Sequence, residues 1–276
     1  MIYELSKDNF TKVSSLHDAV SHNLVIKSVL AGHSPGRVWI NDIQNPSSSF
    51  LWEMVNGMFY LAGDSTNAAF NEDVNSLLKE RVFPELTRLN YDDFNLVVTP
   101  ASWQDQIWLI LKDISPRLER IQGFVLRSEK EFKLPQWRDS IPPGFLMQRI
   151  TRQILDNNLL ENREDIEYCV KACWSSIDRY LDHGIGYCLL HENVITSWCS
   201  TDFVIADDGE LYVETFGQYQ NKGFGTLCAA ACVAECLTQQ YTLYWHCWAD
   251  HFSSIKIAQK VGFEKTFEDS VYSISL

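Results

Sequence analysis

The second half of the chain switches repeatedly between the two spacings of apolar residues that distinguish strands from helices. Short apolar runs bounded by turn residues predict strands at 145–150, 185–192, 194–206, 210–216 and 241–249. Apolar positions three and four apart predict helices at 161–183, 224–239 and 253–261. A closing pair of strands falls within 263–276. Strands and helices that interleave in this order predict an α/β fold (an α+β mixed sheet).

The first half has the same mixture of patterns. Apolar runs predict strands at 37–42, 57–63, 95–100 and 120–127, and helical spacing predicts helices at 67–89 and 104–114. Asn67 or Asn71 is the expected N-cap of the helix at 67–89, and Pro84 is expected to break or kink it. The polar segment QNPSSS, followed by LWEMV, is expected to bridge the first two strands. We therefore predict a second α/β domain.

The segment LPQWRDSIPPGF, residues 134–145, is rich in proline and polar residues. Such composition is typical of a domain boundary. We predict an N-terminal domain over 1–135 and a C-terminal domain over 136–276.

The charge of the chain narrows its possible partners. The chain has 36 acidic and 23 basic residues, a formal net charge of -13. A surface of this sign repels nucleic acids and anionic membranes, so we expect neither as a partner, whereas it tolerates a cationic amine. The N-terminus lacks the basic and apolar regions of a signal peptide, and no apolar stretch is long enough to span a bilayer. We predict a cytoplasmic protein.

All eight cysteines lie after residue 168. Cys228, Cys232 and Cys236 are four residues apart and therefore share one stripe of a helix. Zinc sites usually use CxxC pairs with converging thiolates, and the chain has no such pair. We predict buried thiols in a reducing compartment and no metal site, with a metal site or a disulfide as the alternatives.

The loop GQYQNKGFG, residues 217–225, joins a predicted strand to a predicted helix. Gly223 has no side chain, so a ligand can approach its backbone, and the first amides of the helix have no intrahelical partner. Together with the positive end of the helix and the cation of Lys222, this predicts a phosphate or diphosphate site. An ordinary helix-entry turn is the alternative. The spacing matches neither a dinucleotide-binding GxGxxG loop nor a Walker loop.

The residues 220–225, QNKGFG, resemble the acetyl-coenzyme A loop of the GCN5-related N-acetyltransferase (GNAT) superfamily, written Q/R-x-x-G-x-G/A. Trp245, Cys247 and Trp248, followed by Ser254, Ala258, Lys260 and Gly262-Phe263, are similar to the signature of its zwittermicin A-resistance-type branch. Glu210, Leu211, Val213 and Thr215 resemble the fourth strand of that branch. The element order extends the resemblance from about residue 143 to 276. It implies a GNAT fold for the C-terminal domain.

The resemblance also implies which residues hold acetyl-coenzyme A, with no metal. The expected contacts are Val213, Thr215, Phe216, Gln220, Asn221, Lys222, Gly223, Phe224, Gly225, Thr226, His251, Ser254 and Lys260, and Lys256 is a further candidate for the 3′-phosphate. A backbone amide near Thr215 or Phe216 is expected to bind the acetyl carbonyl. Two positions depart from the pattern: His251 stands where the branch usually has Asn, and Ala258 stands where many superfamily members have a tyrosine acid. His251, Ser254 and Tyr272 remain candidates for the acid.

The resemblance implies an acyltransferase that passes an acetyl group directly to the amine of a small molecule. Candidate catalytic groups are Glu210, Glu214 and His246, of which we prefer Glu210 as the base. The N-terminal domain has aromatic-rich strands and no phosphate loop, and its element order resembles a degenerate GNAT-like fold. We expect it to serve the acceptor site. A non-catalytic acyl-coenzyme A sensor and an unrelated α/β protein are the alternatives.

Overall fold

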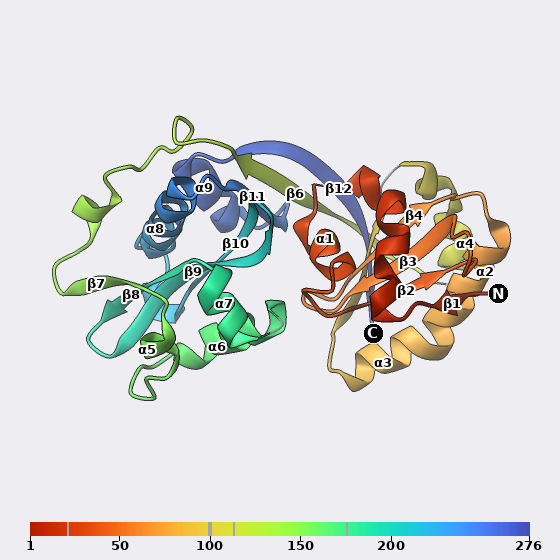
Figure 1. Cartoon of the computed structure of the whole chain (residues 1–276), viewed down its shortest axis with the longest axis horizontal. Helices are drawn as coiled ribbons and strands as arrows, with labels where there is room; N and C mark the ends of the chain where they lie inside the picture. Colours follow the sequence, from red (N-terminus) through yellow and green to blue (C-terminus); the bar gives the residue numbers. More distant parts are fainter. Residues whose placement is uncertain (21, 99–100, 113, 175) are drawn as a thin grey trace. The chain divides into compact units, whose positions relative to one another are not determined.

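The computed structural model describes residues 1–20, 22–98, 101–112, 114–174 and 176–276 (Figure 1). The chain divides into two compact units, one of Met1–Ile121 and Glu268–Leu276, and one of Gln122–Phe267. The proline-rich segment 134–145 lies inside the second unit, because its Trp137 is buried against Ala230 and Ala231. Among the described residues, none of the helices combines the length and the apolar character needed to cross a bilayer.

The first unit contains a mixed sheet with the strand order β1-β2-β3-β4-β5-β12. Strands β4 and β5 are parallel, the other described pairs are antiparallel, and residues 270–275 of β12 pair with 93–98 of β5. Its elements are β1 Tyr3–Glu4, η1 Lys7–Val20, α1 Leu24–Leu30, β2 Gly36–Ile40, β3 Ser48–Glu53, β4 Met58–Gly63, α2 Ala68–Leu77, η2 Leu78–Val82, α3 Phe83–Arg88, β5 Asp93–Val98, η3 Ala101–Gln106, α4 Ile107–Ile110 and β6 Arg117–Leu126.

Two helix predictions in this unit are refined by the structure. The Asn67 side chain accepts a hydrogen bond from the Phe70 N–H at 3.0 Å, so Asn67 is the N-cap of α2. Pro84 does not break the helical run, because the π-helical turn η2 precedes it and Pro84 then lies at the start of α3, where its missing N–H is tolerated. The helix predicted at 104–114 is only a 3₁₀ segment and the short α4; residue 113 is outside the described residues.

Strand β3 is an element that the polar pattern concealed. Ser48 and Ser49 are fully buried, and Ser48 Oγ donates to the Asp64 carbonyl at 2.8 Å. Polar side chains satisfied in this way do not produce the apolar alternation that predicts a strand. The predicted bridge between two strands is therefore a third strand. The last two residues of the strand predicted at 95–100 lie outside the described residues.

The second unit contains a mixed sheet with the strand order β7-β8-β9-β10-β11-β6, and β12 lies next to β6. This mixed α/β architecture confirms the predicted fold class. Its elements, besides the end of β6, are η4 Trp137–Ser140, β7 Phe145–Arg149, α5 Arg152–Leu155, α6 Arg163–Cys173, α7 Ile177–His183, β8 Gly186–His191, β9 Val194–Ile205, β10 Asp208–Thr215, η5 Gly217–Tyr219, α8 Phe224–Thr238, β11 Thr242–Trp248, α9 Phe252–Val261 and β12 Glu264–Ser275.

Helices cover the two faces of this sheet in separate groups (Figure 1). Helix α8 packs against β8, β9, β10 and α9, and the core between them includes Leu211, Cys228 and Trp245. Helix α6 packs against β9, where Trp198 and Cys199 point to opposite faces as strand alternation requires. Residues of β10 and β11 therefore point alternately toward α8 and toward the α6 side.

Two predicted elements in this unit differ from the structure. The single helix predicted at 161–183 is α6 and α7, because Trp174 is extended and buried with its indole N–H donating to the Thr201 carbonyl at 3.2 Å. Ser176 then caps α7 by accepting from the Arg179 N–H at 3.1 Å, and residue 175 is outside the described residues. The closing pair of strands is one long strand, β12, since its two halves pair with β5 and β6 and not with each other.

Candidate active site

The two parallel strands β10 and β11 are paired at their N-terminal ends. Residues 208, 209 and 210 are in register with 242, 243 and 244. Within the described residues this register does not reach Thr215, so the C-terminal ends of the two strands are free to hold something other than each other. The loop 216–223 and the start of α8 follow directly from that end of β10.

Antiparallel pairing fixes where the amides at the end of β10 point. The Phe216 N–H donates to the Thr196 carbonyl at 3.1 Å, and Thr215 is in register with Ser197. Because amide direction alternates along such a ladder, the Thr215 N–H points away from β9 and toward the side of β11. Of the two amides expected to hold a carbonyl, the one of Phe216 is thus used inside the sheet and the one of Thr215 faces the opening.

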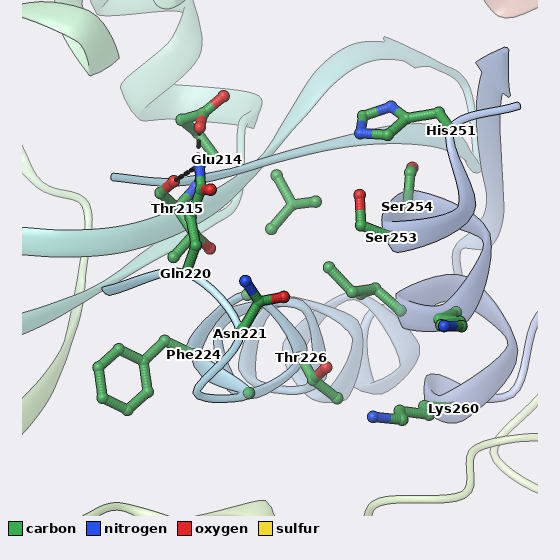
Figure 2. Close-up of a pocket in the computed structure, with 15 residues that line it drawn as sticks. Glu214, Thr215, Gln220, Asn221, Phe224, Thr226, His251, Ser253, Ser254 and Lys260 are labelled. Carbon is green, nitrogen blue, oxygen red and sulfur yellow. Dashed lines mark hydrogen bonds between the residues drawn. The ribbon is translucent and has the colours of Figure 1, made fainter. Parts of the chain in front are cut away.

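A cavity of about 510 Å³ lies where β10, the loop, α8 and α9 meet (Figure 2). In Figure 2, Glu214 and Thr215 lie on one side of the cavity, and His251, Ser253 and Ser254 lie across from them. The lining residues all belong to the second unit; they are Val213, Glu214, Thr215, Gln220, Asn221, Gly223, Phe224, Gly225, Thr226, His251, Ser253, Ser254, Lys256, Ile257 and Lys260.

The glycine loop has the backbone form that an anion site requires. Gly223 has a φ of 82°, in the left-handed region, and a Cβ atom built on it meets nothing within 4 Å. Gly225 is needed for a different reason, because its Cβ would lie 2.9 Å from Thr215 Oγ1. The Gln220 side chain donates to the Thr215 carbonyl at 3.0 Å and so ties the loop to the end of β10. The loop is therefore tied to the end of β10, with open space over Gly223.

The N-terminus of α8 supplies donors beside this space. The first intrahelical bond runs from the Leu227 N–H to the Gly223 carbonyl at 3.1 Å, so the amides of Phe224, Gly225 and Thr226 precede the helical ladder. These amides lie at the positive end of the helix dipole, which favours an anion at this place. This arrangement fits the diphosphate of a nucleotide coenzyme.

Most of the predicted coenzyme contacts line the cavity, and two do not. Phe216 uses its N–H in the sheet, and the Lys222 ammonium lies 5.6 Å from the centre of the Tyr219 ring. Ser253 and Ile257 also line the cavity, although they are not among the predicted contacts. With Lys256 and Lys260 they form one face of α9 at spacings of three and four, a signal that the sequence contains.

The three candidate catalytic residues lie on the face of the sheet opposite α8. Glu210 Oε1 is 2.8 Å from His246 Nδ1, and both side chains are 14% exposed. His246 also packs at 5.2 Å against the Phe267 ring. Its neighbour Cys247 packs against the core under α8. Of Glu210, Glu214 and His246, only Glu214 is part of the cavity lining.

The Glu210–His246 pair is part of a larger buried polar group. Glu210 Oε2 and His246 Nε2 are buried without a hydrogen-bond partner among the described residues. Burial raises the pKa of Asp202 well above its usual range, and the nearby charge of Glu210 raises it further. The pair therefore holds two unused polar atoms in a place where polar atoms are costly to leave unpaired.

The cysteines of α8 are buried as their spacing predicted. Cys228, Cys232 and Cys236 are fully buried, and the Cys232 thiol lies 3.4 Å from the Ile185 carbonyl. Burial raises the pKa of each of these thiols, and that of Cys188 to about 12, so they are protonated and apolar in character.

Tyr272, considered above as an acid, packs against the core of the first unit. No group of three or more metal-binding side chains occurs among the described residues.

Comparison with known proteins covers almost the whole chain. The family model described as GNAT acetyltransferase matches residues 14–272. The "Uncharacterized N-acetyltransferase YdfB" of Bacillus subtilis (strain 168) is 25% identical over 272 residues, which is 99% of this chain and 98% of that protein.

Solved structures share the fold at lower identity. The GCN5-related N-acetyltransferase-like protein from Streptococcus suis 89/1591 has a TM-score of 0.70 and 22% identity, covering 98% of this chain and 100% of the other. A tandem GNAT protein from the clavulanic acid biosynthesis pathway has a TM-score of 0.61 and 10% identity, covering 100% and 98%. These structures extend the likeness of fold over both units.

Proposed function

The chain belongs to the GNAT acetyltransferase family and is an acyltransferase, and from this premise we propose that it transfers an acetyl group from acetyl-coenzyme A to the amine of a small molecule. The observation that carries the proposal is the open space over Gly223, where the loop and the first amides of α8 converge. The match of Trp245, Ala258 and Phe263 to its signature supports the zwittermicin A-resistance-type branch, and these three residues lie in the core of the second unit.

The lining of the cavity fits the coenzyme group by group. The amides of Phe224, Gly225 and Thr226 would hold the diphosphate, and Lys256 and Lys260 on α9 would hold the 3′-phosphate. Val213, Thr215 and Ile257 line the cavity around Gly225 and would hold the pantetheine arm. The coenzyme would supply the activated acetyl group as its thioester.

We propose direct transfer within a ternary complex. Glu210, Glu214 or His246 takes one proton from the ammonium group of the acceptor. The amine nitrogen then bonds to the thioester carbonyl carbon while Thr215 N–H stabilises the carbonyl oxygen. The carbon–sulfur bond breaks, the nitrogen loses its second proton, and the sulfur gains one. The products are the amide, the free thiol and the proton held by the base.

We further propose that the first unit is a GNAT-like fold without a coenzyme site and that it serves recognition of the acceptor. In each unit, three antiparallel strands precede a parallel pair, β4 and β5 in the first and β10 and β11 in the second. The segment after β4 reads DSTN and lacks the paired glycines of the segment after β10. The fold likeness to a tandem GNAT protein supports this proposal.

The proposal is tested with the full-length protein, acetyl-coenzyme A and a panel of small primary amines. Thiol release that depends on one class of amine, with one acetylated amine formed for each thiol, is the expected result. Binding of acetyl-coenzyme A without thiol release for any amine would favour the sensor over the proposed small-amine transferase. Absence of coenzyme binding would contradict the site itself.

A further inference from the structure

The amide of Thr215 has a hydrogen-bond partner inside its own strand. Glu214 Oε1 accepts from the Thr215 N–H at 3.0 Å, and Tyr212 Oη donates to Glu214 Oε2 at 3.2 Å. Figure 2 shows the Glu214 carboxylate directly against Thr215 at the edge of the cavity. The amide that faces the opening is therefore occupied by a neighbouring carboxylate.

The backbone at this contact is held by the neighbouring strand β9, whereas the carboxylate is held only by groups of its own strand. The Ser197 hydroxyl donates to the Glu214 carbonyl at 2.7 Å and lies 2.8 Å from Thr215 Oγ1. These contacts hold the main chain at the end of β10. The Glu214 carboxylate is partly exposed and hydrogen-bonds only within 212–215 among its contacts in the described residues. Rotation of one side chain is enough to free the Thr215 N–H without moving the strand.

We propose that the Glu214 carboxylate is a placeholder: it occupies the Thr215 N–H until the thioester carbonyl replaces it. The displaced carboxylate then acts as the base. The inference rests on the proposed function. When the acetyl carbonyl takes the Thr215 N–H, the Glu214 carboxylate rotates away from that amide, on the face of the sheet opposite α8, and accepts a proton from the acceptor ammonium. The carboxylic acid then passes this proton to water and rebinds Thr215 after the products leave. Base and acetyl group are thus brought into place together.

The placeholder has a thermodynamic consequence that distinguishes two ligands. Acetyl-coenzyme A must displace the carboxylate before its carbonyl can use Thr215, whereas free coenzyme A has no acetyl carbonyl and need not. When a group of the protein occupies part of a ligand's site, the apparent dissociation constant of the ligand is its intrinsic dissociation constant divided by the fraction of molecules in which the site is free. Hydrogen bonds to charged groups are stronger than neutral ones, so Glu214 lowers the affinity for acetyl-coenzyme A relative to coenzyme A.

The experiment measures both dissociation constants by calorimetry in full-length wild type, Glu214→Ala, Glu214→Gln and Glu264→Ala. Glu264 is an exposed carboxylate at the start of β12, outside the cavity lining, and serves as the matched control. The ratio of the two constants cancels any general effect of charge on phosphate binding. We expect Glu214→Ala to raise the preference for acetyl-coenzyme A on the order of tenfold, Glu214→Gln to raise it less, and Glu264→Ala to leave it unchanged.

If the ratio of the two dissociation constants in Glu214→Ala equals that of wild type, the placeholder is overturned. If wild type binds neither acetyl-coenzyme A nor coenzyme A, the proposed function is contradicted instead. The proton-accepting role has its own readout, the turnover of Glu214→Gln compared with that of Glu210→Gln. A fall of about a hundredfold in Glu214→Gln supports the role, since a lost general base typically costs this much. A fall in Glu210→Gln with none in Glu214→Gln assigns the proton to Glu210 and overturns this half of the inference. Thermal unfolding of each variant verifies that the fold is retained.

Discussion

At the scale of single residues, Gly223 combines two requirements that only a hydrogen side chain meets. Its φ of 82° is strained for any other residue, and the space above it is the space that a diphosphate would fill. Gly144 has nearly the same φ, 84°, and its Cβ would only touch the His191 ring at 3.9 Å. A substitution at Gly144 therefore tests backbone strain alone, whereas a substitution at Gly223 tests strain together with the loss of ligand space.

We predict that Gly223→Val lowers the affinity for acetyl-coenzyme A by about a hundredfold, the equivalent of a few lost hydrogen bonds. Gly144→Val, which has the same strain outside the cavity, should leave the affinity within about twofold. Calorimetric titration of both variants measures this difference. Equal loss in the two variants would show that strain alone is responsible and would remove the diphosphate from Gly223.

His17 makes the stability of the first unit depend on pH. It is 3% exposed, its Nε2 lies 3.3 Å from Ser49 Oγ, and burial lowers its pKa from 6.5 to about 4. Between these two values the unfolded chain binds a proton that the folded chain does not, so the free energy of unfolding falls as the pH drops. The fall should approach about 3 kcal/mol at pH 4.

Replacement of this side chain should remove that part of the pH dependence. Unfolding by denaturant at pH 7 and pH 4.5 should show a smaller difference for His17→Gln than for wild type, while the exposed His183→Gln behaves like wild type. A pH dependence that is identical in wild type and His17→Gln would mean that the pKa of His17 is the same in the folded and the unfolded chain.

At the scale of elements, α9 gathers four residues of the site on one face. Ser253, Lys256, Ile257 and Lys260 all line the cavity, and their spacing of three and four places them together on one side of a helix. Val261 and Ala258, fully buried, anchor the other side. The helix therefore presents two cations to the cavity on a firmly packed support.

We predict that the double substitution Lys256→Ala and Lys260→Ala weakens binding of coenzyme A by about tenfold, since exposed ion pairs each contribute up to about 1 kcal/mol. Binding of 3′-dephospho-coenzyme A should change less than about threefold, because the group that the lysines contact is missing. Calorimetry with the two ligands at low salt provides the comparison. An equal loss for both ligands would place the lysines at the diphosphate and not at the 3′-phosphate.

At the scale of the whole molecule, each unit is completed by a strand from a distant part of the sequence. Residues 122–126 of β6, which precede the proline-rich segment, lie beside β11 in the second unit, and Phe124 and Leu126 belong to its core. Residues 270–275 of β12, at the end of the chain, pair with β5 in the first unit. A cut between the units in sequence therefore damages at least one of them.

We predict that a fragment of residues 136–276 does not fold, because loss of β6 leaves the edge of β11 unpaired and opens the core at Phe124 and Leu126. A fragment of residues 116–276 retains β6 and is the matched control. Thermal unfolding followed by circular dichroism should be cooperative for the longer fragment only. A cooperative transition with coenzyme binding in the shorter fragment would show that β6 is dispensable.

The sequence alone determined the features that depend on near neighbours in the chain. Residues 210–225 predicted a strand, a glycine turn and a helix start, because apolar period, left-handed backbone and unpaired helical amides are all local properties. The same kind of reasoning narrowed the N-cap of α2 to Asn67 or Asn71, and the structure selects Asn67. Most of the cavity lining could be named because it is contributed by this segment and by one face of a single helix.

Tertiary structure decided what depends on distant pairing and on side-chain rotation. Partners for β6 and β12 are chosen by edges and cores that the chain brings together only when folded, so the boundary at 134–145 could not mark the units. Buried Ser48 and Ser49 concealed β3, since their hydroxyls are satisfied by contacts that no periodicity reveals. The Glu214 carboxylate lies on the Thr215 amide because β9 fixes the direction of that amide, and sequence spacing does not specify a rotamer.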